Sequence, residues 1–250
     1  MRRWFKTDLH VHTCLSPCAD LTMSPRKIVA EVLRQQLDII AITDHNSAEN
    51  VSAVRMAAAG SAVVVLAGME VCTVEEAHVL AVFDNPESAL ALQALVFDHL
   101  QGENNPDVFG LQVIANEADE VEGFQEKLLI GATDISLEET VKAVHRLGGL
   151  AIAAHIDRES FSVIGQLGFI PETVRFDALE ISTNISNEEA GTRFREYAAY
   201  RFVRNSDAHF LDQLGKNATG FLLEQPTLQE IADVLHASDG RNVQLFRAHA

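Results

Sequence analysis

Cysteine is scarce in this sequence: Cys14, Cys18 and Cys72 are the only three among 250 residues. So few cysteines in a chain of this length do not form a disulfide framework, and they favour reduced thiols or metal ligation. Long apolar runs are also missing, because no stretch approaches the roughly 20 residues that span a bilayer. The basic residues at the N-terminus lead into no apolar segment with a cleavage site. We therefore expect a cytoplasmic protein with no signal peptide and no membrane partner.

Basic residues are few as well. The chain has 19 Lys and Arg against 36 Asp and Glu, a formal net charge of −17. This balance argues against a broad basic face for duplex DNA. It argues against long nucleic acid as a partner and favours a small phosphorylated substrate. Two or three divalent cations bound in one cleft would add roughly +4 to +6 there and would allow an acidic protein to bind a phosphate.

Short apolar segments alternate with helical patterns along the chain, without internal repeats. The expected strands are 7–11, 38–43, 62–67, 78–83, 150–155, 178–182, 202–206, 220–223 and 243–246. Their continuous aliphatic character is typical of strands buried on both faces, as in a parallel sheet. Helix starts are marked by Ser24-Pro25 and by the capping-box pairs Ser136 with Glu139 and Thr227 with Glu230. The pattern predicts an α/β fold, an irregular (β/α) barrel formed by residues 1–250 as a single domain.

Residues 84–135 interrupt this alternation. The segment is acidic and includes the turn-forming stretch ENNPD. We expect it to be a helical insertion between strands that caps the site.

Histidines gather where strands begin or end. Six of the ten lie there: His10, His12, His45, His78, His155 and His209. His10 and His12 are two apart on one strand, so their side chains face the same side. Barrel enzymes keep catalytic groups at the C-terminal ends of their strands, where Asp44-His45, Glu70 and Asp207 also fall. Histidines with carboxylates in one cleft suit Zn, Mn or Fe in a centre of several ions.

These motifs resemble those of the PHP family (polymerase and histidinol phosphatase). The similarity extends from residue 8 to beyond 209, in the order His10-x-His12, Asp44-His45, Glu70 with His78, His155, and Asp207-x-His209. It implies a distorted (β/α)₇ barrel with a centre of two or three divalent metal ions, Zn, Mn or Fe. Many members hydrolyse phosphoesters.

The resemblance also implies a ligand set. The first metal would be held by His10, His12, Glu70 and Asp207; the second by Glu70, His78 and His155; the third by His45 and His209. Relatives with three metals have one more histidine or aspartate ligand for the third site, and Cys18 falls at the matching position. A thiolate would tilt that site toward Zn or Fe. The alternatives for Cys18 are a small packing residue or a thiol beside the ligands, with Asp20 as the ligand instead.

Three residues receive roles in the implied reaction. Glu70 would bridge two metals, which lower the pKa of water toward about 7 and so supply a nucleophile. Asp44 would orient His45 or act on the leaving group, unless it only caps a turn. Arg158 offers bidentate recognition of phosphate, with a surface ion pair as the alternative.

The sequence therefore predicts a metal-dependent phosphoesterase that acts on a small metabolite or nucleotide. Two alternatives stay open. One is a non-catalytic, metal-bound regulatory or scaffold module of nucleic-acid metabolism, against which the complete ligand set argues. The other is a metal-dependent amidohydrolase, which would order its ligands differently and often uses a modified lysine. The sequence sets no oligomeric state.

Overall fold

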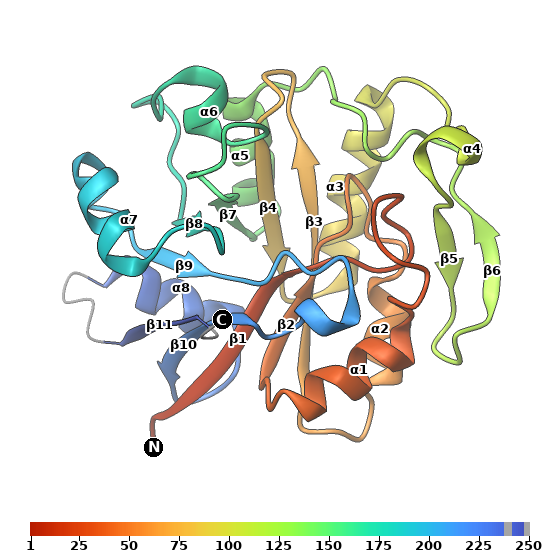
Figure 1. The fold of residues 1–250 in the computed structure, drawn as a ribbon, viewed down its shortest axis with the longest axis horizontal. Coiled ribbons are helices and arrows are strands. Elements are labelled where there is room, and N and C mark those ends of the chain that lie inside the picture. Colours follow the sequence, from red (N-terminus) through yellow and green to blue (C-terminus); the bar gives the residue numbers. More distant parts are fainter. Residues whose placement is uncertain (238–241, 248–250) are drawn as a thin grey trace.

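The computed structural model describes residues 1–237 and 242–247 (Figure 1). A nine-stranded sheet curls into a nearly closed barrel in the strand order β11-β10-β1-β2-β3-β4-β7-β8-β9. The strands are β1 Arg3–Val11, β2 Ile39–Ile42, β3 Val64–Cys72, β4 His78–Phe83, β7 Leu150–Ala153, β8 Ala178–Ile181, β9 Phe202–Arg204, β10 Asn217–Leu223 and β11 Val243–Arg247. The residues after β9 return to β1, where the backbone N–H of His12 donates to the carbonyl of Ala208 at 3.0 Å. The predicted α/β class and distorted barrel are confirmed.

The sheet is mixed, and the expectation of a parallel sheet is wrong in part. Four neighbouring pairs are parallel, but β4 runs antiparallel to both β3 and β7, and β10 runs antiparallel to both β1 and β11. Only residues 73–77 connect β3 to β4, a link that allows a hairpin and is too short for a parallel crossover. The strands nevertheless read as continuous apolar runs, because helices cover the outside of the barrel and the strands' own inward side chains fill its inside.

Helices flank the barrel as its outer layer. They are α1 Pro25–Arg34, α2 Val51–Ala57, α3 Pro86–His99, α5 Leu137–Arg146, α6 Val163–Leu167, α7 Asn187–Arg193 and α8 Leu228–His236, with short 3₁₀ turns at η1 Arg195–Tyr197 and η2 Leu211–Gln213. Ser136 and Glu139 form the predicted capping box of α5, and Thr227 accepts from the N–H of Glu230 at α8. Ser24 forms no side-chain cap, so Pro25 alone favours the start of α1. In the described part of the chain, no helix is long and apolar enough to cross a membrane.

Alternate residues of each strand enter two apolar layers. Ile39 and Ala41 of β2 pack with Leu66 among the strands, while Ile40 and Ile42 pack toward the helices. The inner layer continues into buried residues of α8, which therefore closes one end of the barrel. The polar strand ends described below lie at the opposite end, and their cluster rests on this apolar interior.

The segment 84–135 contains more than helices. After α3 it forms a short helix, α4 Pro106–Phe109, and then an antiparallel pair, β5 Val113–Ala115 with β6 Val121–Phe124 (Figure 1, right). Asn46 anchors the end of the segment, because its side-chain amide donates to the carbonyls of Leu129 and Gly131 at 2.8 Å each. Only short-range patterns had indicated helices here, and a three-residue strand leaves little periodicity to detect.

Asp177 joins two helices far from the histidine cluster and should give a pH-dependent contribution to stability. His145 of α5 and His236 of α8 both contact its carboxylate, at 2.9 and 2.8 Å. The hydrogen bond to Asp177, opposed by partial burial, raises the pKa of His145. Burial acts to raise the pKa of Asp177, but hydrogen bonds from His145 and the Ala151 N–H outweigh it and lower that pKa.

The His145→Gln variant tests this contribution. The pair of Asp177 and His145 stabilises the fold fully between pH values of about 3.9 and 6.5, the pKa values of Asp and His in the unfolded chain. This stabilisation is lost as pH rises through the raised pKa of His145. Because His145 is more than a third exposed, we expect a loss of at most about 1 kcal/mol near pH 5. Urea unfolding at pH 5 and pH 9 measures it. An equal loss at both pH values would contradict the assignment.

Candidate metal centre

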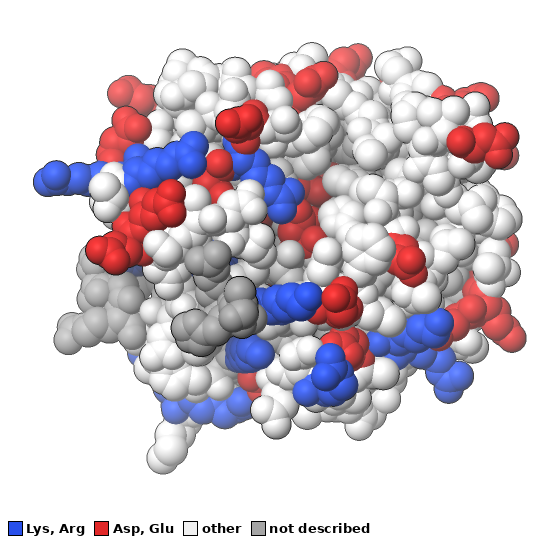
Figure 2. All heavy atoms as spheres, viewed as in Figure 1, with Lys and Arg blue, Asp and Glu red and all other residues white. Residues whose placement is uncertain are grey.

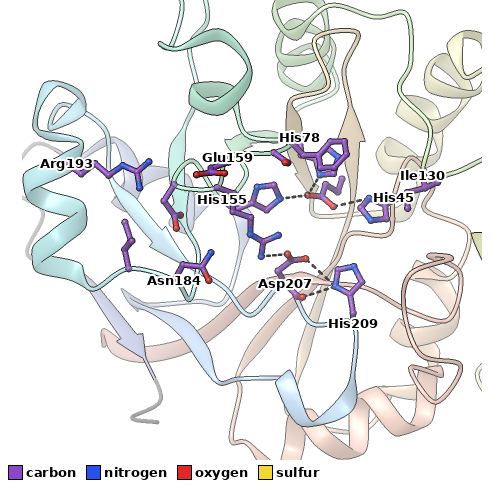
Figure 3. Close-up of a pocket in the computed structure, with 15 residues that line it drawn as sticks. His45, His78, Ile130, His155, Glu159, Asn184, Arg193, Asp207 and His209 are labelled. Atoms are coloured by element: carbon purple, nitrogen blue, oxygen red, sulfur yellow. Dashed lines mark hydrogen bonds and ion pairs between the residues drawn. The ribbon is translucent and has the colours of Figure 1, made fainter.

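Six segments bring their polar residues to one end of the barrel. Figure 3 shows five of these residues beside the cavity: His45, His78, His155, Asp207 and His209. The parallel strands β1, β2, β7 and β9 deliver residues at or just beyond their C-terminal ends, among them His12, His45, His155 and Asp207. The antiparallel strand β4 instead presents its first residue, His78. The reversed direction of β4 explains why this histidine precedes its apolar run while the others follow theirs.

Four side chains converge on one point and define the first ligand group: His10, His12, Glu70 and Asp207. The Nε2 atoms of His10 and His12 are 3.2 Å apart, and each lies 3.2 Å from Asp207 Oδ1 and 3.4 Å from an oxygen of Glu70. Four donors bound at about 2.0–2.2 Å to a tetrahedral Zn²⁺ would stand roughly 3.3–3.6 Å apart. The spacing of the donors therefore fits a divalent ion.

The opposite ring nitrogens of this pair already have partners. His10 Nδ1 lies 3.1 Å from both oxygens of Glu180, and His12 Nδ1 lies 2.9 Å from the hydroxyl of Ser16. A carboxylate only accepts, and the Ser16 hydroxyl already donates to Asp44, so each Nδ1–H is assigned as the donor. In the neutral rings this assignment leaves the Nε2 lone pairs directed at each other. Two lone pairs at 3.2 Å repel unless a cation lies between them, so this arrangement also favours a metal.

Glu70 lies at the centre of the cluster. Its Oε1 is 2.8 Å from His78 Nδ1 and 3.1 Å from His155 Nε2, and its Oε2 is 3.0 Å from His45 Nδ1. Burial acts to raise the pKa of this carboxyl, but His78, His10 and His45 outweigh burial and hold the pKa well below its usual range. His45, Glu70 and His78 form the second ligand group. One carboxylate thus belongs to two ligand groups, as a bridging ligand must.

A third group consists of His12, His45 and His209. The ring of His12 lies 4.6 Å from that of His45 and 4.2 Å from that of His209, between centroids. Cys18 is exposed beside this group and belongs to none of the three groups, although His209 and His45 lower the pKa of its thiol to about 6 against the desolvation that raises it. The family resemblance implied that only Glu70 is shared between metal sites. In the structure His12 and His45 also belong to two groups each. Asp20 is engaged elsewhere, as its carboxylate accepts from Thr22.

Backbone strain coincides with the predicted ligands. His155 has φ of 29° and Asp207 has φ of 50°, values that non-glycine residues rarely adopt. Such residues cost about 1–3 kcal/mol each and persist where the surrounding structure imposes them, commonly at functional sites. The chain bends sharply as it leaves β7 and β9, and these bends direct both side chains toward Glu70 or its neighbours.

Sequence reasoning missed the supporting residues. Glu180 of β8 is buried, contacts His10, and accepts from the side chain of Asn205 at 2.7 Å and from the N–H of His155 at 2.9 Å. A single glutamate in the apolar strand ALEI was the signal for it. Ser16 was equally hidden, because a serine in a loop has no pattern of its own.

Asp44 lies beneath the cluster. Its carboxylate accepts from the N–H and hydroxyl of Thr13 at 2.7 and 2.8 Å, and from the hydroxyl of Ser16 at 2.7 Å. Burial raises its pKa against these hydrogen bonds. Through Ser16 it orients His12, whereas the expected partner was His45. Asp44 does not line the cavity, so its position favours support of a ligand over action on a leaving group.

A cavity of about 640 Å³ opens beside the cluster, and acidic side chains lie recessed near the middle of this face (Figure 2). Arg158 lines it and forms an ion pair between its Nη2 and Asp207 Oδ2 at 2.7 Å. Ile130 is the residue through which the segment 84–135 reaches the cavity wall. Arg158 therefore presents a guanidinium at the edge of the first ligand group, where it was predicted to meet phosphate.

A barrel with overlapping histidine and carboxylate groups at its strand ends is suited to binding metal ions. The PHP domain model matches residues 8–158. The chain belongs to the PHP family, which is generally enzymatic, and this supports a hydrolase. A comparison with curated proteins gave no match.

Solved structures of similar fold agree with this placement. The lesion-specific endonuclease PfuEndoQ from Pyrococcus furiosus superposes with a TM-score of 0.76 at 16% identity, covering 96% of this chain and 58% of its own. Endonuclease Q in complex with a 27-mer duplex carrying an abasic lesion superposes with a TM-score of 0.68 at 16% identity, covering 96% of this chain and 58% of its own. A putative metal-dependent phosphoesterase from Bifidobacterium adolescentis superposes with a TM-score of 0.57 at 19% identity, covering 92% of this chain and 95% of its own. The chain thus spans 58% of the length of the endonuclease structures, and identities this low establish the fold alone.

The expectation about partners is corrected by these findings. We expected a small phosphorylated substrate and argued against long nucleic acid, but an endonuclease of the same fold is described with a DNA duplex at its active site. The argument from net charge failed because it averages over the whole surface. Bound cations and cavity arginines such as Arg158 act locally, over distances of about a Debye length or less.

Proposed function

We propose that this protein is a metal-dependent phosphoesterase that hydrolyses a phosphodiester bond of nucleic acid. The observation that carries the proposal is the position of Glu70, whose carboxylate lies within 3.4 Å of ring nitrogens from five histidines and is shared by two ligand groups. The likeness to structures titled as endonucleases supports the choice of nucleic acid as the substrate class.

The chain's residues would divide the work. His10, His12, Glu70 and Asp207 would hold one ion, and Glu70 with His45, His78 and His155 would hold another. Divalent ions such as Zn, Mn or Fe, when bound, polarise a phosphoryl oxygen and lower the pKa of water toward about 7. Arg158 would bind a non-bridging phosphate oxygen while Asp207 holds its guanidinium in place. Glu180, Ser16 and Asp44 keep His10 and His12 in the ring orientation that ligation needs.

The test is hydrolysis by protein purified with Mn²⁺ or Zn²⁺, with metal content measured on the same sample. End-labelled oligonucleotides are offered as single strands, as duplexes and as duplexes with an abasic site. We expect cleavage of at least one form, with the rate proportional to metal content. Protein with full metal occupancy that cleaves none of them would refute nucleic acid as the substrate.

Cys18 decides how many ions the centre holds. We propose that its thiolate completes the third group with His45 and His209, since these two histidines favour the thiolate by lowering the pKa of the thiol. Cys18→Ala should then lower the metal content by one ion per chain, measured by plasma mass spectrometry. The matched control is Cys14→Ala, whose thiol is buried against Val113 outside the ligand groups. Equal metal content in wild type and Cys18→Ala would show that the thiol is no ligand.

A further inference from the structure

Phe161 is a large aromatic residue that the metal centre and the proposed reaction leave without a role. It lies in the loop after His155, lines the cavity, and is 43% exposed. Its ring stacks on His78, a member of the second ligand group, with centroids 4.9 Å apart and planes at 27°. We infer that Phe161 is the stacking platform of a subsite for one unpaired nucleobase, next to the phosphate held by the metal centre. This inference rests on the proposed function.

The loop holds Phe161 in place at an energetic cost. Phe161 has φ of 58°, a left-handed conformation that is unfavourable for a bulky residue. Its carbonyl accepts from the N–H of His78 at 2.9 Å, so the backbone as well as the ring is tied to that ligand. On the other side, the hydroxyl of Ser162 donates to the carbonyl of Arg158 at 2.6 Å.

Close packing behind the loop makes it rigid. Helix α6 approaches the loop at Gly165, where a Cβ atom would come within 2.4 Å of the carbonyl oxygen of Glu159. The loop is therefore fixed from both sides before any substrate binds. A stacking surface that is already immobile costs little conformational entropy when it is occupied.

The rest of the cavity combines apolar and cationic groups with the carboxyl groups of Asp157 and Glu159. Ile130 adds apolar surface, and the labelled side chains of Arg193 and Asn184 lie across the cavity from His78 (Figure 3). Within residues 1–237 and 242–247, no carboxylate forms an ion pair with Arg193. Its guanidinium carbon lies 5.2 Å from the centroid of the Phe194 ring, and the guanidinium would meet a second phosphate of the nucleic acid. An apolar wall near the ligand groups with a cation opposite matches a base and its neighbouring backbone.

The base must be unpaired. A paired base inside a duplex is stacked on both faces, so it reaches an aromatic ring in a cavity only from a single strand or after leaving the helix. Stacking on an aromatic side chain tolerates every base, because each base has a π-face. The subsite would therefore select unpaired over paired nucleotides without reading sequence.

The experiment measures binding of hydrolysis-resistant phosphorothioate single strands to the metal-loaded protein by fluorescence anisotropy. Two strands are compared, one with all bases and one with an abasic residue at the position next to the central linkage. The variants are Phe161→Leu, Phe161→Tyr and the control Phe169→Leu, an exposed phenylalanine in a separate surface hollow. Metal content is measured for each variant.

We expect Phe161→Leu to weaken binding of the complete strand roughly 5- to 100-fold and to leave the abasic strand nearly unchanged. Phe161→Tyr and Phe169→Leu should bind like wild type. Equal weakening for both strands, or loss of metal as the cause, would show that Phe161 only supports His78 and would overturn the inference. Because the strands are not cleaved, the binding assay is independent of the hydrolysis assay. Absence of hydrolysis would refute the proposed function. Equal effects of Phe161→Leu on the complete and abasic strands would refute the subsite.

Discussion

Glu70→Gln is expected to lower kcat/KM for oligonucleotide cleavage on the order of 10³-fold and to reduce the metal content of the protein. Glutamine keeps the shape of the side chain but removes the negative charge that two ligand groups share. An amide oxygen is a weaker ligand for Zn, Mn or Fe than a carboxylate, and one amide cannot serve two ions as well. The buried histidines around it would then lose the anion that balances the bound cations.

The matched control is Glu87→Gln, the same substitution at an exposed position in α3. It should leave the rate and metal content unchanged. Circular dichroism of both variants verifies that the barrel is intact. If Glu70→Gln retained both the wild-type rate and the wild-type metal content, Glu70 could not be the shared ligand, and the centre as described would be wrong.

Removing the metals is expected to lower the melting temperature by roughly 5 to 15 °C. An ion present at 100 to 1,000 times its dissociation constant stabilises the folded state by about 2.7 to 4.1 kcal/mol. For a chain of about 250 residues, each kcal/mol shifts the melting temperature by about 2–4 °C. Without ions, the facing nitrogens of His10 and His12 remain buried 3.2 Å apart with no cation between them.

Differential scanning calorimetry before and after treatment with a chelator measures this shift, and adding Mn²⁺ or Zn²⁺ back should reverse it. The His145→Gln variant is a useful control, because His145 and Asp177 lie away from the metal centre. Its melting temperature should fall by the same amount as that of the wild type when the metals are removed. A melting temperature that does not respond to the chelator, in protein shown to have lost its metal, would contradict a centre built into the barrel end.

The sequence was a good guide to which polar residues meet, because the barrel gathers strand ends in one place. His10, His12, Glu70 and Asp207 are spread over nearly 200 residues, yet each stands at or just beyond an apolar run. His78 fitted poorly until the structure showed β4 to be antiparallel. Direction within a sheet depends on which strands become neighbours, and short-range patterns do not encode that.

Other features depended on three-dimensional contacts. Glu180 reads as one glutamate in an apolar strand, and only burial beside His10 gives it a role. Asp44 was assigned to the neighbouring His45, but its Ser16 contact directs it to His12. The substrate class was misjudged because composition counts charges without regard to place. Phe161 carried no signal at all, since an exposed aromatic residue in a loop is common.

The central claim is that this PHP barrel binds metal ions in overlapping groups that share Glu70. The most direct measurement is a crystal structure of protein grown with Mn²⁺ or Zn²⁺, with anomalous diffraction data at the absorption edge of the metal. The account predicts one peak among His10, His12, Glu70 and Asp207, and a second on the other side of Glu70 toward His78 and His155. No peak at either position, in crystals of protein with measured metal content, would contradict it.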